Sequence, residues 1–185
     1  MSRSSQAKIL RLTRKVHRLT GIALFIFFIL VGLTGAILGW KKNSGGYLLA
    51  TTSTGTSSDS KSWLPLDSLN SIAMKHYIGM TGNGNNKIDR IDVRPDKGIA
   101  KMLFLNGYDA IQVDLATGAI LKEEKRRGDF IEHIHDGTYM DEILGLNSGI
   151  FKLIYTTLMG LALVLFSVSG FWLWYGPKQM RKHSS

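Results

Sequence analysis

Two long runs without a charged side chain lie near the ends of this 185-residue chain. Leu19–Trp40 covers 22 residues and Leu153–Pro177 covers 25. A helix rises 1.5 Å per residue, so about 20 residues cross the ~30 Å hydrocarbon core of a lipid bilayer. Both runs therefore predict transmembrane helices. A cleaved signal peptide is the alternative for the first run, but its apolar core is longer than such a signal has and no clean cleavage site accompanies it.

The charged residues divide the chain in the same way. All 14 acidic residues lie between Asp59 and Glu142, and both ends of the chain are purely basic. Basic residues crowd the start of the first run and the end of the second, which favours a cytoplasmic location for both termini. The central segment is then outside, in the periplasm if the membrane is a bacterial inner membrane. Because the basic residues flank apolar runs, the net charge of +9 does not indicate nucleic-acid binding.

The central segment has the pattern of a small α+β domain. The stretch Thr51–Ser60 is rich in serine and threonine and predicts a flexible loop. A short helix follows, for which Asp67 or Ser68 is the expected cap. Three or four antiparallel strands with tight turns come next. The helix's expected apolar stripe consists of Leu69, Ile72, Ala73 and Tyr77.

A mixed-charge run, KEEKRR, occupies positions 122–127. It predicts a solvated helix face, and electrostatic docking of a partner is the alternative. Zero cysteines exclude disulfides, thiolate metal sites and cysteine catalysis. Phosphate-binding loops and zinc-protease motifs are also missing from the sequence, and there is no hydrolase signature.

Three motifs resemble one family in their order and placement. His17–Gly21 (HRLTG) is similar to the start of PepSY-associated transmembrane proteins, and Val113–Ile120 (VDLATGAI) resembles the closing turn of a PepSY domain. His135-Asp136-Gly137, with the later SGFWLW ending at Trp174, resembles that family's second span. Ile134 stands where the family has leucine. Family members that act as iron–siderophore reductases are about twice this length and have four spans, whereas this chain has two.

The resemblance implies an α-helical membrane protein, with two transmembrane helices flanking a small α+β PepSY-like extracytoplasmic domain. The expected layout is a cytoplasmic basic N-terminus over 1–18, a first span over 19–40, the outer domain over 41–149, a second span over 150–175 and a cytoplasmic tail over 176–185. The implied function is electron transfer linked to iron or siderophore uptake. A ferric or siderophore reductase subunit is the possible enzymatic role.

Histidines carry the candidate chemistry. Neutral imidazole is a usual axial ligand of haem iron, so His17, His135 and His133 are the candidate cofactor-binding residues, with His17 and His135 as axial ligands of haem b. The alternatives are an interfacial or capping role for His17 and a surface position for the other two. His17 and His135 lie on opposite sides of a ~30 Å layer, so one haem cannot use both. His183 shares the side of His17 but lies three residues from the C-terminus.

Partners follow from that geometry. A homodimer, or a complex with another membrane subunit, would supply the second ligand on each side. Gly32, Gly35 and Gly39 form a small-residue face that suits close helix packing, between copies or between the two spans of one chain. A non-enzymatic alternative also stands, in which the tethered outer domain docks a periplasmic or membrane protein by accepting an extended segment on a sheet edge.

Overall fold

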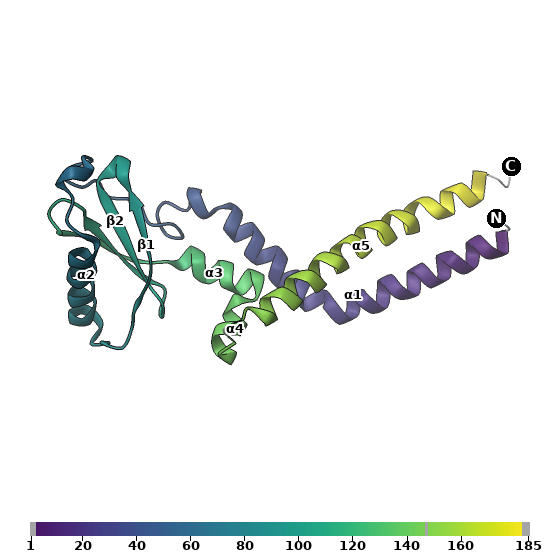
Figure 1. Ribbon diagram of the computed structural model, residues 1–185. Helices are drawn as coiled ribbons and strands as arrows, with labels where there is room; N and C mark the ends of the chain where they lie inside the picture. The colour runs from purple at the N-terminus through teal and green to yellow at the C-terminus, as the bar shows by residue number, and fades with distance from the viewer. Residues whose placement is uncertain (1–2, 147, 183–185) are drawn as a thin grey trace. The chain divides into compact units, whose positions relative to one another are not determined.

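A computed structural model describes residues 3–146 and 148–182, and the chain divides into two compact units (Figure 1). The helical unit contains the residues up to 37 and those from 132 onward. The sheet unit contains residues 38–131.

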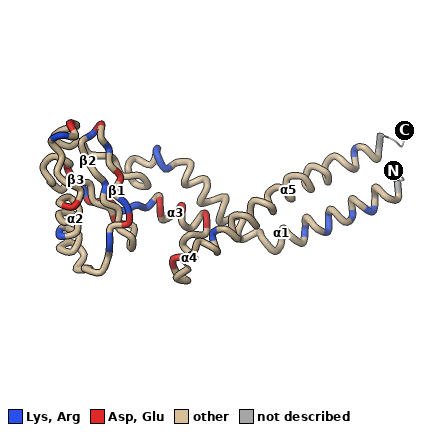
Figure 2. The backbone as a smooth tube through the Cα atoms, in the orientation of Figure 1, with Lys and Arg blue, Asp and Glu red and all other residues tan. Residues whose placement is uncertain are grey.

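The helical unit is built on two long helices, α1 (Arg3–Gly39) and α5 (Ile150–Lys182). The start of α1 and the end of α5 lie at the same end of the pair, so the helices are antiparallel (Figure 1). Both are long and apolar enough to cross a membrane, over Ser4–Gly39 and Ile150–Met180. Each helix continues past its expected span on the basic side, where Lys and Arg gather (Figure 2). Their large apolar side chains are mostly exposed, as lipid-facing side chains must be.

Two short helices precede α5 in the chain. Helix α3 spans Arg127–Asp136 and helix α4 spans Thr138–Leu144. Asp141 of α4 is buried and accepts the backbone N–H groups of Phe151 at 3.0 Å and Lys152 at 2.9 Å. It thereby satisfies two donors in the first turn of α5, where a negative charge also complements the helix dipole.

The sheet unit contains a four-stranded antiparallel sheet in the order β1-β2-β3-β4. The strands are β1 (Ile88–Arg94), β2 (Ile99–Phe104), β3 (Asp109–Asp114) and β4 (Ile120–Lys125). Helix α2 (Leu66–Thr81) covers one face and buries three of the four expected stripe residues there: Leu69, Ala73 and Tyr77. Tyr77 stacks on Phe104 with ring centroids 3.9 Å apart. The expected helix and strands are thus confirmed.

The predicted flexible loop is instead an extended segment held along the other face of the sheet. Ser53 N–H donates to Gln112 at 2.7 Å, and Thr56 N–H donates to Asp114 at 2.7 Å. Gly55 N–H donates to the Lys97 carbonyl at 2.8 Å. Burial alone would raise the pKa of Asp114, but hydrogen bonds from Thr56 and from backbone N–H groups lower it below the ordinary value. Buried polar side chains of β3 therefore hold the segment on the sheet, although its composition predicted a flexible loop.

Two further expectations are wrong. Neither Asp67 nor Ser68 caps α2, whose N-cap position is Pro65 without a side-chain hydrogen bond. The run 122–127 is not a helix face, because its first four residues end strand β4. The strand's charges alternate between faces. Glu124 bonds buried Lys101 and Gln112 on one face, and Glu123 bonds His76 of α2 on the other. These long-range partners override the helical propensity of the charged run.

Candidate functional site

The ring of His17 lies between the two long helices of the helical unit. Its Nδ1 is 2.7 Å from the Ser169 hydroxyl of α5. Phe166 meets the ring edge-on at 4.7 Å between centroids. A Cβ added at Gly170 would stand 3.8 Å from the ring's Cε1. His17 therefore faces α5, and this group of His17, Ser169 and Gly170 is called the His17 site.

The ring of His135 contacts a hydroxyl residue and a glycine of α1 in the same way. Its Nδ1, at the end of α3, is 2.8 Å from the Thr34 hydroxyl of α1. A Cβ added at Gly35 would stand 3.3 Å from the ring's Cε1. This group of His135, Thr34 and Gly35 is called the His135 site. Each site thus combines a histidine on one helix with a hydroxyl residue and a glycine that are adjacent on another.

Hydrogen bonding assigns the same tautomer to both rings. The Thr34 hydroxyl donates its one proton to the Leu30 carbonyl at 2.6 Å, and the Ser169 hydroxyl donates to the Leu165 carbonyl at 2.6 Å. Each hydroxyl oxygen is left as an acceptor, so each imidazole donates through Nδ1–H. In the neutral form of each ring the lone pair is then on Nε2. Nε2 makes no hydrogen bond to the described residues in either ring, and both side chains are only half-buried.

The glycines make room for the imidazoles. At Gly35 a Cβ 3.3 Å from the ring would be closer than nine in ten real Cβ contacts, so a side chain larger than alanine's would push His135 away from Thr34. The expected small-residue face on α1 is therefore partly used within the chain. Gly32 and Gly39 have no atom within 4 Å of an added Cβ, and helix packing there stays a prediction.

A tight corner after α3 holds His135 in place. Gly137 has φ +83°, and an added Cβ would meet Tyr155 at 3.0 Å, so only glycine suits this turn. Asp136 pairs with Lys152 at 2.5 Å and bonds Thr138. Burial alone would raise the pKa of Asp136, but Lys152 and Thr138 lower it below the ordinary value, which keeps the carboxylate ionised beside the histidine.

The other histidines do not join these sites. His133 points away from His135, as two residues' separation on a helix predicts, and its Nδ1 is 2.6 Å from Glu142. His76 bonds Glu123 in the sheet unit at 2.6 Å. His183 lies outside the described residues. In the part of the chain that the structure describes, no group of three or more histidine, aspartate or glutamate side chains could hold a bare metal ion.

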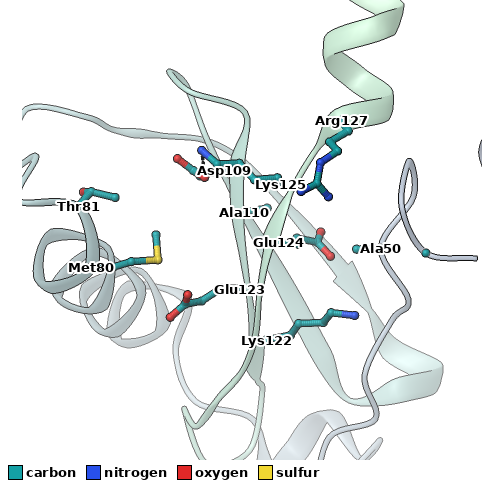
Figure 3. Close-up of a pocket in the computed structure, with 11 residues that line it drawn as sticks. Ala50, Met80, Thr81, Asp109, Ala110, Lys122, Glu123, Glu124, Lys125 and Arg127 are labelled. Atoms are coloured by element: carbon teal, nitrogen blue, oxygen red, sulfur yellow. Dashed lines mark ion pairs between the residues drawn. The ribbon is translucent and has the colours of Figure 1, made fainter.

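The sheet unit has a separate groove along the free edge of β4 (Figure 3). Its volume is about 520 Å³, and its walls include Met80 and Thr81 of α2 on one side and Ala50 on the other. A second hollow of about 710 Å³ continues it between α2 and β4 and shares Met80 and Glu123. The sequence predicted an edge strand able to accept a partner. Only the strand order of the sheet shows that β4 is such an edge strand.

Sequence reasoning found both histidines but missed Thr34 and Ser169. The one signal in the sequence was a hydroxyl residue followed by glycine, at 34–35 in the first span and at 169–170 in the second, but the first span has another such pair at 20–21. Such pairs are common in membrane helices and did not by themselves point to a partner.

Comparison with known proteins agrees with this architecture. The family model described as the PepSY-associated TM region matches residues 14–184, which includes both histidine sites, α1 from residue 14 onward and all of α5. No curated protein and no solved structure matched the chain. The chain is therefore a membrane protein of the PepSY-associated transmembrane family.

Proposed function

We propose that this protein is a haem-binding electron-transfer component of a bacterial inner membrane, linked to iron or siderophore uptake. The observation that carries the proposal is the pair of imidazoles whose Nδ1–H is bonded to a helix hydroxyl. A ligand histidine in proteins normally has its second ring nitrogen bonded in this way, which fixes the ring and its tautomer. The link to iron or siderophores rests on the resemblance to siderophore reductases.

The donor set at both sites fits an axial role. A neutral imidazole with its lone pair on Nε2 is what haem iron takes from a protein. Haem, when bound, supplies a one-electron carrier inside the low-dielectric layer. Ser169 and Thr34 hold the rings by accepting Nδ1–H. Gly170 and Gly35 leave space beside Cε1, and Phe166 braces the ring of His17.

Two separate sites are required. Thr34 and His17 are both on α1, and their Cα atoms are 17 residues apart, or about 26 Å along the helix axis. One haem cannot bind His17 and the ring held by Thr34 at that separation. Among the described residues each site offers one imidazole, so we propose that a second copy of the chain, or another membrane subunit, supplies the other axial ligand. Two two-span chains would then form a four-helix assembly.

We also propose that both termini are cytoplasmic and that the sheet unit is periplasmic. Lys and Arg gather at the start of α1 (Figure 2), and Lys178, Arg181 and Lys182 follow the apolar part of α5 in the sequence. That excess favours the cytoplasm. Alkaline phosphatase fused after Ser60 is expected to be active, and the same enzyme fused after Ser185 inactive. The reverse pattern of activity would contradict the orientation.

Haem binding has a direct optical test. The full chain, purified in mild detergent from cells supplied with haem precursor, is expected to show a Soret band and, after dithionite reduction, the α-band of a b-type haem. The matched sample is the His17→Ala/His135→Ala double variant prepared in parallel, which should be colourless. A colourless native chain would contradict the proposal.

A second candidate function is docking of an extended protein segment by the sheet unit. The groove beside the free edge of β4 favours it, because strand addition needs an open edge and room on both sides of it (Figure 3). This function does not depend on haem, and both can belong to one protein.

A further inference from the structure

The free edge of β4 offers its backbone groups to a partner at known positions. In the β3–β4 pair Lys125 is opposite Asp109, and Glu123 is opposite Ile111. Arg126 N–H donates to the Tyr108 carbonyl, so this neighbouring pair is a hydrogen-bonded one. Antiparallel pairs alternate, so the N–H and C=O groups of Lys125 and Glu123 point away from β3. No backbone or side-chain group among the described residues bonds them.

The other edge of the sheet is less suited to strand addition. Strand β1 carries a bulge between Ile88 and Arg90, and Pro95 follows its last residue. Bulges and prolines are devices that disfavour pairing at a sheet edge. Strand β4 also carries an extra residue, because Gln112 pairs with Lys122 and Val113 pairs with Ile120, which leaves Leu121 without a partner in β3. This bulge lies at the start of β4, and Lys122–Lys125 pair regularly with β3 up to the last residue of the strand.

Charge on one side of the β4 edge is positive. Lys122 bonds only Thr51, and the guanidinium of Arg127 lies over the Tyr47 ring, 4.6 Å from its centroid. Neither has a carboxylate partner among the described residues. Glu124 on the same side is neutralised by Lys101. A strand added here would therefore meet two cations that no carboxylate neutralises, on the face away from α2 (Figure 3).

The side towards α2 is more apolar. Ile72, Met80 and Ile120 line the hollow there, with Gly79 leaving space between α2 and β4. Glu123 on this side is bonded to His76. Side chains of a strand alternate between the two faces, so an added strand would place every second residue on these apolar walls.

We propose that the β4 edge binds an extended segment of a partner protein in which acidic and apolar residues alternate. The backbone of the segment pairs with Glu123 and Lys125, its carboxylates face Lys122 and Arg127, and its apolar side chains face Ile72 and Met80. The proposal rests on the docking function above and adds the register, the edge and the chemistry of the partner.

The test is binding of fluorescein-labelled VEVEVEVE to the full chain in uncharged detergent micelles, measured by fluorescence anisotropy. Saturable binding is expected, with VKVKVKVK at least tenfold weaker. Removing both cations, by Lys122→Gln with Arg127→Gln, should weaken the acidic peptide about fivefold, which is ~1 kcal/mol of binding free energy, or roughly 0.5 kcal/mol for each of two exposed ion pairs. Lys97→Gln removes a cation elsewhere in the same unit and should leave binding unchanged.

Methylation of the peptide's backbone amides tests whether the peptide pairs with a strand edge. The amides of alternate residues point to the same edge, so methylating all four valine amides or all four glutamate amides blocks one edge only. One methylated peptide should keep its affinity and the other should lose it, and equal effects would overturn strand addition. Equal binding of VKVKVKVK would overturn the acidic specificity while leaving docking intact. Binding of no peptide would overturn the docking function together with this inference.

Discussion

His17→Ala and His135→Ala are each expected to remove about half of the haem absorbance, because each ring belongs to a separate site. The reduced-minus-oxidised spectrum of the purified chain measures the loss. The two variants should lose different parts of the α-band, since the two rings have different neighbours. His76→Ala, in the sheet unit, is the matched control and should keep full absorbance. Loss of haem from His76→Ala with retention in the other two would refute the assignment.

Removing the hydroxyl of Ser169 or Thr34 tests whether these groups position the two imidazoles. Ser169→Ala and Thr34→Val remove the acceptor of Nδ1–H and should lower haem affinity at one site by about 10- to 100-fold, as loss of such a partner does in metal sites. A shifted midpoint potential in the haem that remains would separate this positioning role from a purely structural one. Ser167→Ala and Thr20→Val are matched controls, because among the described residues both hydroxyls bond carbonyls of their own helix, that of Thr20 including the His17 carbonyl, and neither bonds an imidazole. Equal effects of test and control variants would mean that the hydroxyls act on helix packing alone.

Gly98→Ala is expected to destabilise the sheet unit by about 3 kcal/mol or more. Gly98 has φ +62°, which costs any other residue conformational energy, and an added Cβ would collide with the Ser57 carbonyl oxygen. The collision would force the segment 51–57 off the sheet and expose the buried polar side chains of β3. Hydrogen–deuterium exchange of the β2 and β3 amides should rise steeply in the full chain.

Gly84→Ala is the control for that experiment. Nothing lies within 4 Å of an added Cβ at Gly84, and its φ is not in the left-handed region. Its exchange should match that of the native chain, and α1 and α5 should stay protected in both variants. Unchanged exchange in Gly98→Ala would show that the segment does not stabilise the sheet.

The spans, the strands and the buried face of α2 were predictable because each is a local pattern. An apolar run of 22 residues or an alternation near Asn106-Gly107 depends on neighbours in the sequence. The prediction of a helix for the KEEKRR run was wrong because the structure of this run depends on residues outside it. Its strand state depends on Lys101, Gln112 and His76, which lie outside the run and bond its two glutamates.

The candidate site was predictable only in part. Histidine suggests an axial ligand by its chemistry, so His17 and His135 could be named from the sequence. Their hydroxyl partners could not, because Ser169 is 152 residues from His17 and Thr34 is 101 residues from His135. Only the fold brings them together, and only then does the tautomer of each ring follow.

We propose that Nε2 of His17 and Nε2 of His135 bind haem, with a second chain completing each site. The most direct test is the haem-to-chain ratio of the purified protein, measured as pyridine haemochrome against protein mass. One haem per chain is expected, because two chains share two haems, and none is expected in the His17→Ala/His135→Ala double variant. A native chain without haem, or a double variant that keeps the native ratio, would contradict this proposal.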